Sequence, residues 1–183
     1  MGAADRNVVQ EVLPEFQEEL LGLPYPVTIL NAVVVRKDST TGEVLGHAIP
    51  DLEGLAAAVA MVRLLIPVKL GPEEIKFVRK TLDMPAKRLA EDLNVDPSTY
   101  SRWENGSQVP GEYVERLLRI YACEVLKLHA PAVNYEASMI TSMRVLAAWP
   151  EGQMPHIVIA RVAYKDRDSR ETTHQWDQAQ EAA

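Results

Sequence analysis

The residues with the clearest chemistry form one short segment in the middle of the chain. Asp96 followed by Pro97 is typical of a helix start, because Asp accepts hydrogen bonds from free backbone N–H groups and Pro is tolerated at the first position. Asn105 and Gly106 are typical of a helix end. Arg102 lies between these boundaries, and a guanidinium can donate to O6 and N7 of one guanine. The segment therefore predicts a short helix that reads the edges of DNA bases.

An amphipathic helix is predicted ahead of this segment, from about residue 72 to residue 82. It begins with Pro72 and two glutamates, which suit the positive end of a helix. Ile75, Val78 and Leu82 recur at spacings of three and four residues, so they predict an apolar stripe that packs. The rest of its surface is basic, with Lys76, Arg79 and Lys80.

A second helix is predicted to start at Pro85, with Leu89, Ala90 and Leu93 on its inward side. It ends at Asn94, a residue that tolerates the left-handed conformation of a tight turn. The third helix follows after a turn of about three residues, which is the geometry of the unit that inserts its second helix into a major groove. The spacing therefore predicts a helix-turn-helix whose ligand is duplex DNA.

The same stretch resembles the XRE, or lambda-repressor-like, helix-turn-helix family. The resemblance lies in SRWENG at 101–106, which is close to the usual end of the recognition helix, and in LAEDLNV at 89–95, which resembles the second helix and turn. It implies that Arg79 and Glu104 form an ion pair between the first helix and the end of the third.

The resemblance also implies which residues contact DNA. Ala86 stands where the family often has a Gln that braces against the DNA backbone, and Ser107 stands where a basic residue often follows the Gly. Phosphate contact is therefore expected to be weaker than in a strong repressor. The residues expected to contact DNA are Pro97, Ser98, Thr99 and Arg102 in the groove, and Ala86, Lys87 and Asn105 near phosphates.

A longer resemblance begins with IPDLEGL at 49–55 and the alanine-rich segment after it. This part is similar to the MqsA/YgiT-type antitoxins, in which a small N-terminal sheet domain binds zinc through two CxxC pairs and holds a toxin. The present chain has one cysteine, Cys123, which follows the motif. We therefore expect no thiolate zinc site, no other metal and no cofactor. A toxin is still a possible partner.

The predicted fold class is α+β, mainly α, with a five-helix-type XRE domain and a small antiparallel β element from an N-terminal hairpin and a C-terminal strand. That last strand must pair either with the hairpin or with its counterpart in a second subunit. The tail after it is expected to be loose. The predicted elements are helices at 6–21, 51–65, 110–128 and 135–149, besides those of the motif, and strands at 27–36, 43–48 and 155–164.

Four regions are expected from this order of elements. Residues 1–66 form an N-terminal hairpin and helix region that dimerises or binds a partner, and residues 67–130 form the DNA-binding domain. Residues 131–165 form a C-terminal helix and strand that offer a second dimerisation surface, and residues 166–183 are a polar tail.

Composition agrees with a folded protein that does not enter membranes. Hydrophobic residues make up 47% of the 183 residues, which is enough for a core. No apolar run is long enough for a membrane span, and the start MGAADRNVVQEV lacks the apolar region of a signal peptide. The net charge of −7 is unusual for a DNA binder, but residues 1–65 carry 9 acids against 4 bases, whereas residues 66–122 carry 9 of each. We expect a bacterial cytoplasmic, nucleoid-associated location.

Enzymatic activity is not expected. The four histidines are scattered, without HExxH or paired metal spacing, and there is no Gly-rich phosphate loop. Cys123 lies on an apolar helix and is more plausible as a core residue than as a nucleophile. No catalytic residue is therefore assigned.

Two functional hypotheses remain at this point. The first is a sequence-specific transcription regulator, a repressor in its expected role, that binds an inverted repeat as a homodimer. The second is the antitoxin of a type II toxin–antitoxin pair, which binds a toxin and regulates its own operon.

Overall fold

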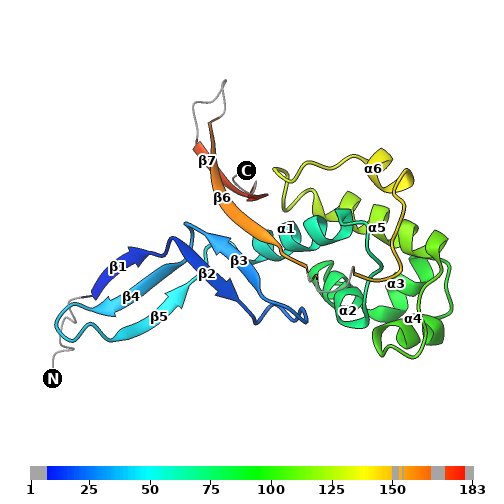
Figure 1. Ribbon diagram of the computed structural model, residues 1–183, viewed down its shortest axis with the longest axis horizontal. Coiled ribbons are helices and arrows are strands. Elements are labelled where there is room, and N and C mark those ends of the chain that lie inside the picture. The colour runs from blue at the N-terminus through cyan, green and yellow to red at the C-terminus, as the bar shows by residue number, and fades with distance from the viewer. Residues whose placement is uncertain (1–7, 150–152, 154, 166–171, 180–183) are drawn as a thin grey trace.

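The computed structural model describes residues 8–149, 153, 155–165 and 172–179. A three-stranded sheet projects from one end of the molecule, and helices α2 to α5 form the other end (Figure 1). A four-stranded sheet and α1 lie between them. The elements are, in order, β1 (Val8–Val12), β2 (Glu15–Glu18), β3 (Val27–Leu30), β4 (Val34–Asp38), β5 (Val44–Ala48), α1 (Leu52–Leu65), α2 (Pro72–Thr81), α3 (Ala86–Asp92), α4 (Pro97–Glu104), α5 (Glu112–Leu126), α6 (Ala137–Thr141), β6 (Val158–Lys165) and β7 (Thr172–Gln178).

The predicted hairpin is present, within the three-stranded sheet β1-β4-β5. β4 and β5 are antiparallel and are joined by the DSTTG turn. The carboxylate of Asp38 accepts from the backbone N–H groups of Thr40 at 2.8 Å and Thr41 at 3.0 Å, and Gly42 adopts a φ of 72°. A polar turn with these contacts reverses the chain locally, so this part was predictable from the sequence.

The predicted helix at 6–21 is wrong. Residues 8–12 form β1, which pairs with β4, and residues 15–18 form β2, which pairs with β3. Pro14 separates the two strands, and a proline inside a helix would remove a hydrogen bond and clash with the preceding turn. The apolar spacing here suited a helix, but pairing with strands further along the chain decides the structure. Residues 6 and 7 lie outside the described residues.

The predicted strand at 27–36 is in fact two strands in two different sheets. Asn31 has a φ of 51°, and the chain bends there between β3 and β4. β3 joins the second sheet, whose strand order is β2-β3-β6-β7. It pairs in parallel with β6, whereas the other pairs of both sheets are antiparallel. The C-terminal strand therefore pairs within its own chain, and the β structure is larger than the small antiparallel element expected.

The expectation of a loose tail is wrong for residues 172–178, which form β7 against β6. Trp176 is 1% exposed, and its indole N–H donates to the backbone carbonyl of Asp51 at 2.9 Å. This contact joins the end of the chain to the start of α1. Pairing with β6 and burial of one large aromatic side chain together hold a segment whose other residues are polar.

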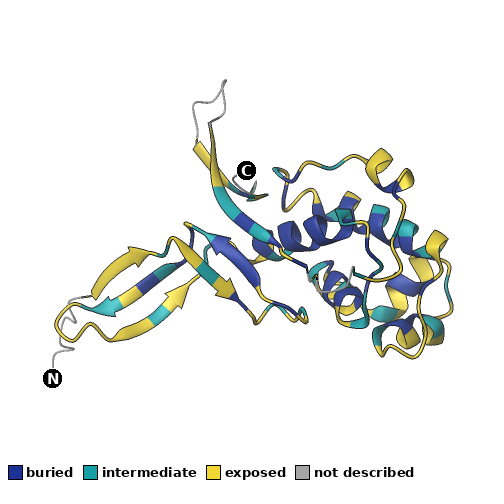
Figure 2. Ribbon diagram, viewed as in Figure 1, coloured by how far each residue is buried: buried dark blue, intermediate teal, exposed yellow. Residues whose placement is uncertain are grey.

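Helix α1 is confirmed and forms the centre of the core. Asp51 caps it by accepting from the backbone N–H of Gly54 at 3.0 Å. Small residues at 56–58 and 60 allow close approach, and α1 packs against α2, α5, β6 and β7. Figure 2 shows α1 almost wholly buried, whereas the projecting three-stranded sheet is mostly exposed.

A buried charged network holds α1, α2 and α5 together. Arg63 on α1 donates to Glu74 on α2, with Nη2 2.8 Å from Oε2. Arg119 donates to Glu115 within α5, with Nη2 2.8 Å from Oε1. The carbonyl of Val68, between α1 and α2, accepts from both arginines, at 3.1 Å and 2.7 Å. The α1–α2 connection is thus positioned by hydrogen bonds from side chains of α1 and α5.

The predicted helix at 135–149 is only partly present, as the short helix α6. After it the chain runs back along the α1–α2 connection, where Leu146 donates to the carbonyl of Pro67 at 2.8 Å and accepts from Lys69 at 2.9 Å. The α+β class is confirmed, with six helices among the described residues. In the same part of the chain, no helix is long and apolar enough to cross a membrane.

Candidate DNA-binding interface

The helix-turn-helix boundaries follow the local signals closely. Pro72 is the first residue of α2, and Glu74 accepts from the backbone N–H of Gly71 at 2.7 Å. Asp96 caps α4 and accepts from the backbone N–H of Ser98 at 2.8 Å. Hydrogen bonds from the hydroxyl and the backbone of Ser98 lower the pKa of Asp96 below its usual value. The carboxylate is thus held charged at the N-terminus of α4, where the helix dipole favours it.

The turn between α3 and α4 depends on Asn94. This residue has a φ of 54°, the left-handed conformation predicted for it. The next residue, Val95, donates to the carbonyl of Ala90 at 2.8 Å and so closes the end of α3. The two helices are therefore set at a defined angle by backbone hydrogen bonds.

The inner faces of α2, α3 and α4 meet in one apolar core. The predicted inward residues Leu89, Ala90 and Leu93 are all buried. On α4, Tyr100 and Trp103 are buried with their ring centroids 5.5 Å apart. Burial raises the pKa of the Tyr100 hydroxyl, and the nearby carboxylate of Glu104 adds to the rise. The core thus determines which side of α4 faces solvent.

The expected ion pair between Arg79 and Glu104 is present. Arg79 Nε lies 2.6 Å from Glu104 Oε1, and Nη2 lies 3.2 Å from Oε2. Nη1 donates to the carbonyl of Met84 at 3.0 Å, in the connection between α2 and α3. The hydrogen bond with Glu104 raises the pKa of Arg79. One guanidinium therefore ties the first helix, the connection and the end of α4 together.

The residues expected to face the groove lie on the outer side of α4. Pro97, Ser98 and Arg102 are exposed, and Thr99 is half-buried. The guanidinium of Arg102 donates to the hydroxyl of Thr99, with Nη2 2.7 Å from Oγ1. The structure thus places Arg102, the residue expected to read a base, in contact with Thr99.

The residues expected near phosphates are more scattered. Lys87 is exposed at the first turn of α3, where it lies 4.0 Å from Glu91 on the same helix. Ala86 is half-buried beside it. Asn105 is exposed after α4, and its carboxamide oxygen accepts from the backbone N–H of Ser107 at 3.0 Å. Contact of these residues with DNA is still a prediction.

Gln108 is a residue of this surface that the sequence did not point out. Gly106, with a φ of 78°, turns the chain back after α4. The backbone N–H of Gln108 then donates to the carbonyl of Arg102 at 3.2 Å, and its side-chain oxygen accepts from Arg102 Nε at 3.0 Å. A polar side chain just after the helix-ending Asn-Gly pair was the only available signal.

Other basic residues of the domain differ in how free they are. Lys76 and Lys80 are exposed on α2. Arg88 is exposed on α3 but lies 3.1 Å from the carboxylate of Asp92, which also accepts from Tyr121. Among the described residues, Lys76 and Lys80 thus form no ion pair, whereas Lys87 and Arg88 each lie near an acid on α3.

The described residues hold no group of three or more His, Cys, Asp and Glu side chains that could bind a metal ion. Cys123 is buried on α5, and burial raises the pKa of its thiol to about 12. The ring of His47 packs at a tilt against that of Phe16, with ring centroids 5.3 Å apart, and His129 lies 3.2 Å from Glu53. Cys123 thus lies in the core, and both histidines contact a neighbouring side chain.

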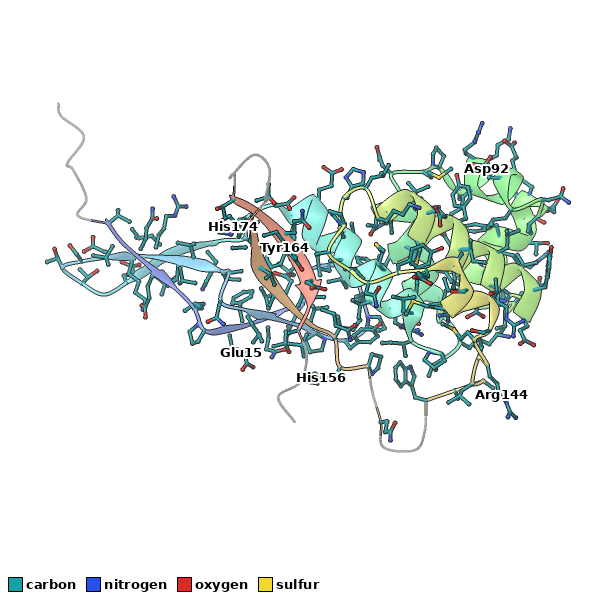
Figure 3. All side chains as sticks on the ribbon, turned by 90° about the horizontal axis from the view of Figure 1, so that it is seen from above. Glu15, Asp92, Arg144, His156, Tyr164 and His174 are labelled. Carbon is teal, nitrogen blue, oxygen red and sulfur yellow. The ribbon has the colours of Figure 1, made fainter. Side chains whose placement is uncertain are left out.

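A cavity of about 690 Å³ lies away from the recognition helix. It is lined by residues of α1, α6, β6 and β7 and of the segments next to them, among them Val62, Asn134 and His156. In Figure 3, His156 lies near the middle of the molecule, whereas Asp92 at the end of α3 lies on the helical end. The cavity is thus separate from the outer side of α4.

A helix-turn-helix family model matches residues 75–128, from α2 to just after α5 and less than a third of the chain. No curated protein and no solved structure matches the chain. The matched range contains every residue expected to contact DNA, together with the ion pair between Arg79 and Glu104. With the caps, the Asn94 turn and the exposed outer side of α4, this match identifies residues 75–128 as an XRE-like helix-turn-helix domain, the DNA-binding unit of a transcription regulator.

Proposed function

We propose that the protein is a sequence-specific transcriptional repressor that binds an inverted-repeat operator as a homodimer. The observation that carries this proposal is the placement of Arg102, which is exposed on α4 and already hydrogen-bonded to Thr99 and Gln108. A guanidinium in that position suits bidentate contact with a guanine. Pro97, Ser98 and Thr99 would lie against the same groove, with Ala86, Lys87 and Asn105 near the phosphates.

The charge distribution supports modest affinity for each half-site. Lys76, Lys80 and Lys87 are exposed, but acids equal bases over residues 66–122. Each phosphate neutralised adds to the salt dependence of binding, so few contacts mean a shallow salt slope and a weak single half-site. Two linked domains would bind far more tightly than one, which favours a dimer.

The repressor assignment rests on how such a dimer would act. Two recognition helices related by a two-fold axis require a two-fold related operator. A protein bound there occupies the promoter without any activity of its own, in the nucleoid of a bacterial cytoplasm. We propose the N-terminal region 1–66 or the C-terminal region 131–165 as the dimerisation segment, because both lie outside the DNA-binding domain.

A mobility-shift assay on the region upstream of the protein's own gene tests the site. Arg102→Ala should lower specific binding at least five-fold, in line with about 1–3 kcal/mol for a bidentate base contact. Lys127→Ala is the control, since Lys127 lies at the end of α5 and pairs with Glu124. Circular dichroism checks that both variants keep the fold. Wild-type binding by Arg102→Ala would rule out this recognition surface.

Light scattering on the purified protein tests the assembly. A homodimer should give about twice the chain mass of 20.4 kDa. A free particle of 20.4 kDa at micromolar concentration, together with only one chain bound per full operator, would contradict the symmetric arrangement.

The second candidate function is an antitoxin that binds a toxin and regulates its own operon. The observation that favours it is the projecting sheet β1-β4-β5, in which every residue of β1 is exposed, including Val8, Val9 and Val12. An exposed apolar edge strand of this kind is suited to a protein partner. Co-expression with any small reading frame beside the gene distinguishes the two candidates. A stable complex and relief of growth arrest would favour the antitoxin, and the absence of such a reading frame would favour the free-standing repressor.

A further inference from the structure

Gln108 makes two separate contacts with Arg102. Its backbone N–H donates to the Arg102 carbonyl at 3.2 Å, which closes the end of α4. Its side-chain oxygen accepts from Arg102 Nε at 3.0 Å. The first contact is available to any residue except proline, but the second requires an acceptor on a side chain of this length.

The two side-chain acceptors hold the guanidinium at different atoms. Gln108 takes the N–H of Nε, and Thr99 takes an N–H of Nη2 at 2.7 Å. Nη1 has no acceptor among the described residues. These two hydrogen bonds favour one orientation of the guanidinium, and the donors of Nη1, with the second N–H of Nη2, are left for a ligand.

The energetics favour a role in binding over a role in folding for the Gln108 side chain. Gln108 and Arg102 are both exposed, and hydrogen bonds between exposed side chains add little to folding stability. The same contact contributes more to the free energy of DNA binding, because a long flexible side chain loses rotamer freedom when it docks on a base. Fixing Arg102 beforehand reduces that loss.

From these contacts we infer that Gln108 is a positioning residue for base recognition: it orients Arg102 so that Nη1 and Nη2 face a guanine, and thereby sets base preference. This inference rests on the proposed function, in which Arg102 reads DNA. The orientation of the amide follows from the chemistry, since only its oxygen can accept from Nε. Its NH2 group then points away from the guanidinium and can donate to the DNA backbone.

The test compares variants by base preference rather than by affinity alone. Duplexes selected from a random pool by the wild-type protein and by Arg102→Ala identify the guanine whose preference depends on Arg102. Binding is then measured on that duplex and on duplexes with each other base at the same position. Gln108→Met, which keeps the length and removes the acceptor, should lower the preference for guanine about three- to ten-fold.

Gln108→Glu is the matched control, because it keeps an acceptor for Arg102 Nε. It should retain the guanine preference while lowering affinity for all duplexes alike, since it adds a negative charge near phosphates.

The possible outcomes distinguish a failure of this inference from a failure of the proposed function. If Gln108→Met keeps the full guanine preference while Arg102→Ala loses it, Gln108 does not position Arg102 and the inference is overturned. If Gln108→Met and Gln108→Glu lose the preference equally, the acceptor is not what matters, which also overturns it. If Arg102→Ala itself keeps both affinity and preference, the proposed function fails first.

Discussion

The hydroxyl of Tyr25 donates to the carboxylate of Glu74 across a distance of 2.6 Å inside the protein. Tyr25 precedes β3 and Glu74 lies on the first turn of α2, so this contact joins the N-terminal sheet to the helix-turn-helix domain. Burial raises the pKa of Tyr25, and the charge of Glu74 raises it further. The DNA-binding domain is therefore attached to the rest of the molecule by a buried polar contact as well as by the chain.

Replacing Tyr25 with Phe should destabilise the fold by about 1–3 kcal/mol, because it leaves a buried carboxylate with one donor fewer. Tyr164→Phe is a matched control, since Tyr164 is 39% exposed and donates to Asp177 at 3.0 Å. We expect the control to change the free energy of unfolding by less than about 1 kcal/mol. Urea unfolding measures both values, and equal effects would show that burial of the Tyr25 contact adds nothing.

Replacing Arg79 with Ala should cost about 1–3 kcal/mol. The side chains of Arg79 and Glu104 are 16% and 13% exposed, so the cost falls below that of a fully buried pair. Arg88→Ala removes the pair with Asp92 on α3, where the arginine side chain is 65% exposed, and should cost less than about 1 kcal/mol. Thermal unfolding compares the two, and a larger loss in Arg88→Ala would contradict the bracing role of Arg79.

The charge of Asp96 should contribute stability that depends on pH. Hydrogen bonds from Ser98 lower the pKa of Asp96 in the folded state below the usual value of 3.8. The stabilisation is therefore complete above about pH 3.8, and it is lost as the pH falls through the lower pKa of the folded state. Asp96→Asn keeps a capping oxygen without the charge. Wild type should be more stable than Asp96→Asn at pH 7, and the difference should shrink below about pH 4. A difference that grows on acidification would reverse the sign and refute this account.

Cys123 should be unreactive in the native protein. With a pKa of about 12 in the fold against 9.0 for a free thiol, its thiolate fraction at pH 8 falls roughly 1000-fold. The disulfide reagent DTNB should therefore react at least that much more slowly with the native protein than with protein unfolded in guanidinium. Comparable rates in the two states would place the thiol at the surface.

Trp176 should be necessary for a stable fold. Trp176→Ala removes a side chain that is 1% exposed and should cost about 3–5 kcal/mol. Trp176→Phe keeps most of the apolar area but loses the N–H bonded to the Asp51 carbonyl, so it should cost less. The control is Val162→Ala on β6. Val162 is 37% exposed, so this change should cost less than about 1 kcal/mol. Urea unfolding that shows no loss for Trp176→Ala would mean that β7 is dispensable.

Local chemistry was sufficient for the helices that carry the site. Asp51, Pro72 and Asp96 start helices in the structure as predicted, and Asn94 adopts the left-handed turn. A cap or a turn is decided by residues a few positions apart, so its signal lies within a short window of sequence. The pair between Arg79 and Glu104 came instead from the family resemblance, and it is present.

The pairing of strands into sheets could not be predicted from such local signals. β3 pairs in parallel with β6, which lies about 130 residues further along the chain, and β7 pairs with β6 and buries Trp176. The apolar spacing in 6–21 fitted a helix, but this segment forms β1, which pairs with β4, and β2, which pairs with β3. Strand pairing is a contact between distant segments, and local periodicity does not specify it.

The sequence by itself thus determined that a three-helix unit with Arg102 on its third helix is present, because caps, turns and apolar stripes act over a few residues. Only the tertiary structure decided how that arginine is held and what the unit is attached to. Gln108 reaches Arg102 because Gly106 turns the chain back. Glu74 meets Arg63 because α1 packs against α2, and it meets Tyr25 because the connection between β2 and β3 reaches α2. These contacts depend on the whole chain being folded, which no short window of sequence can specify.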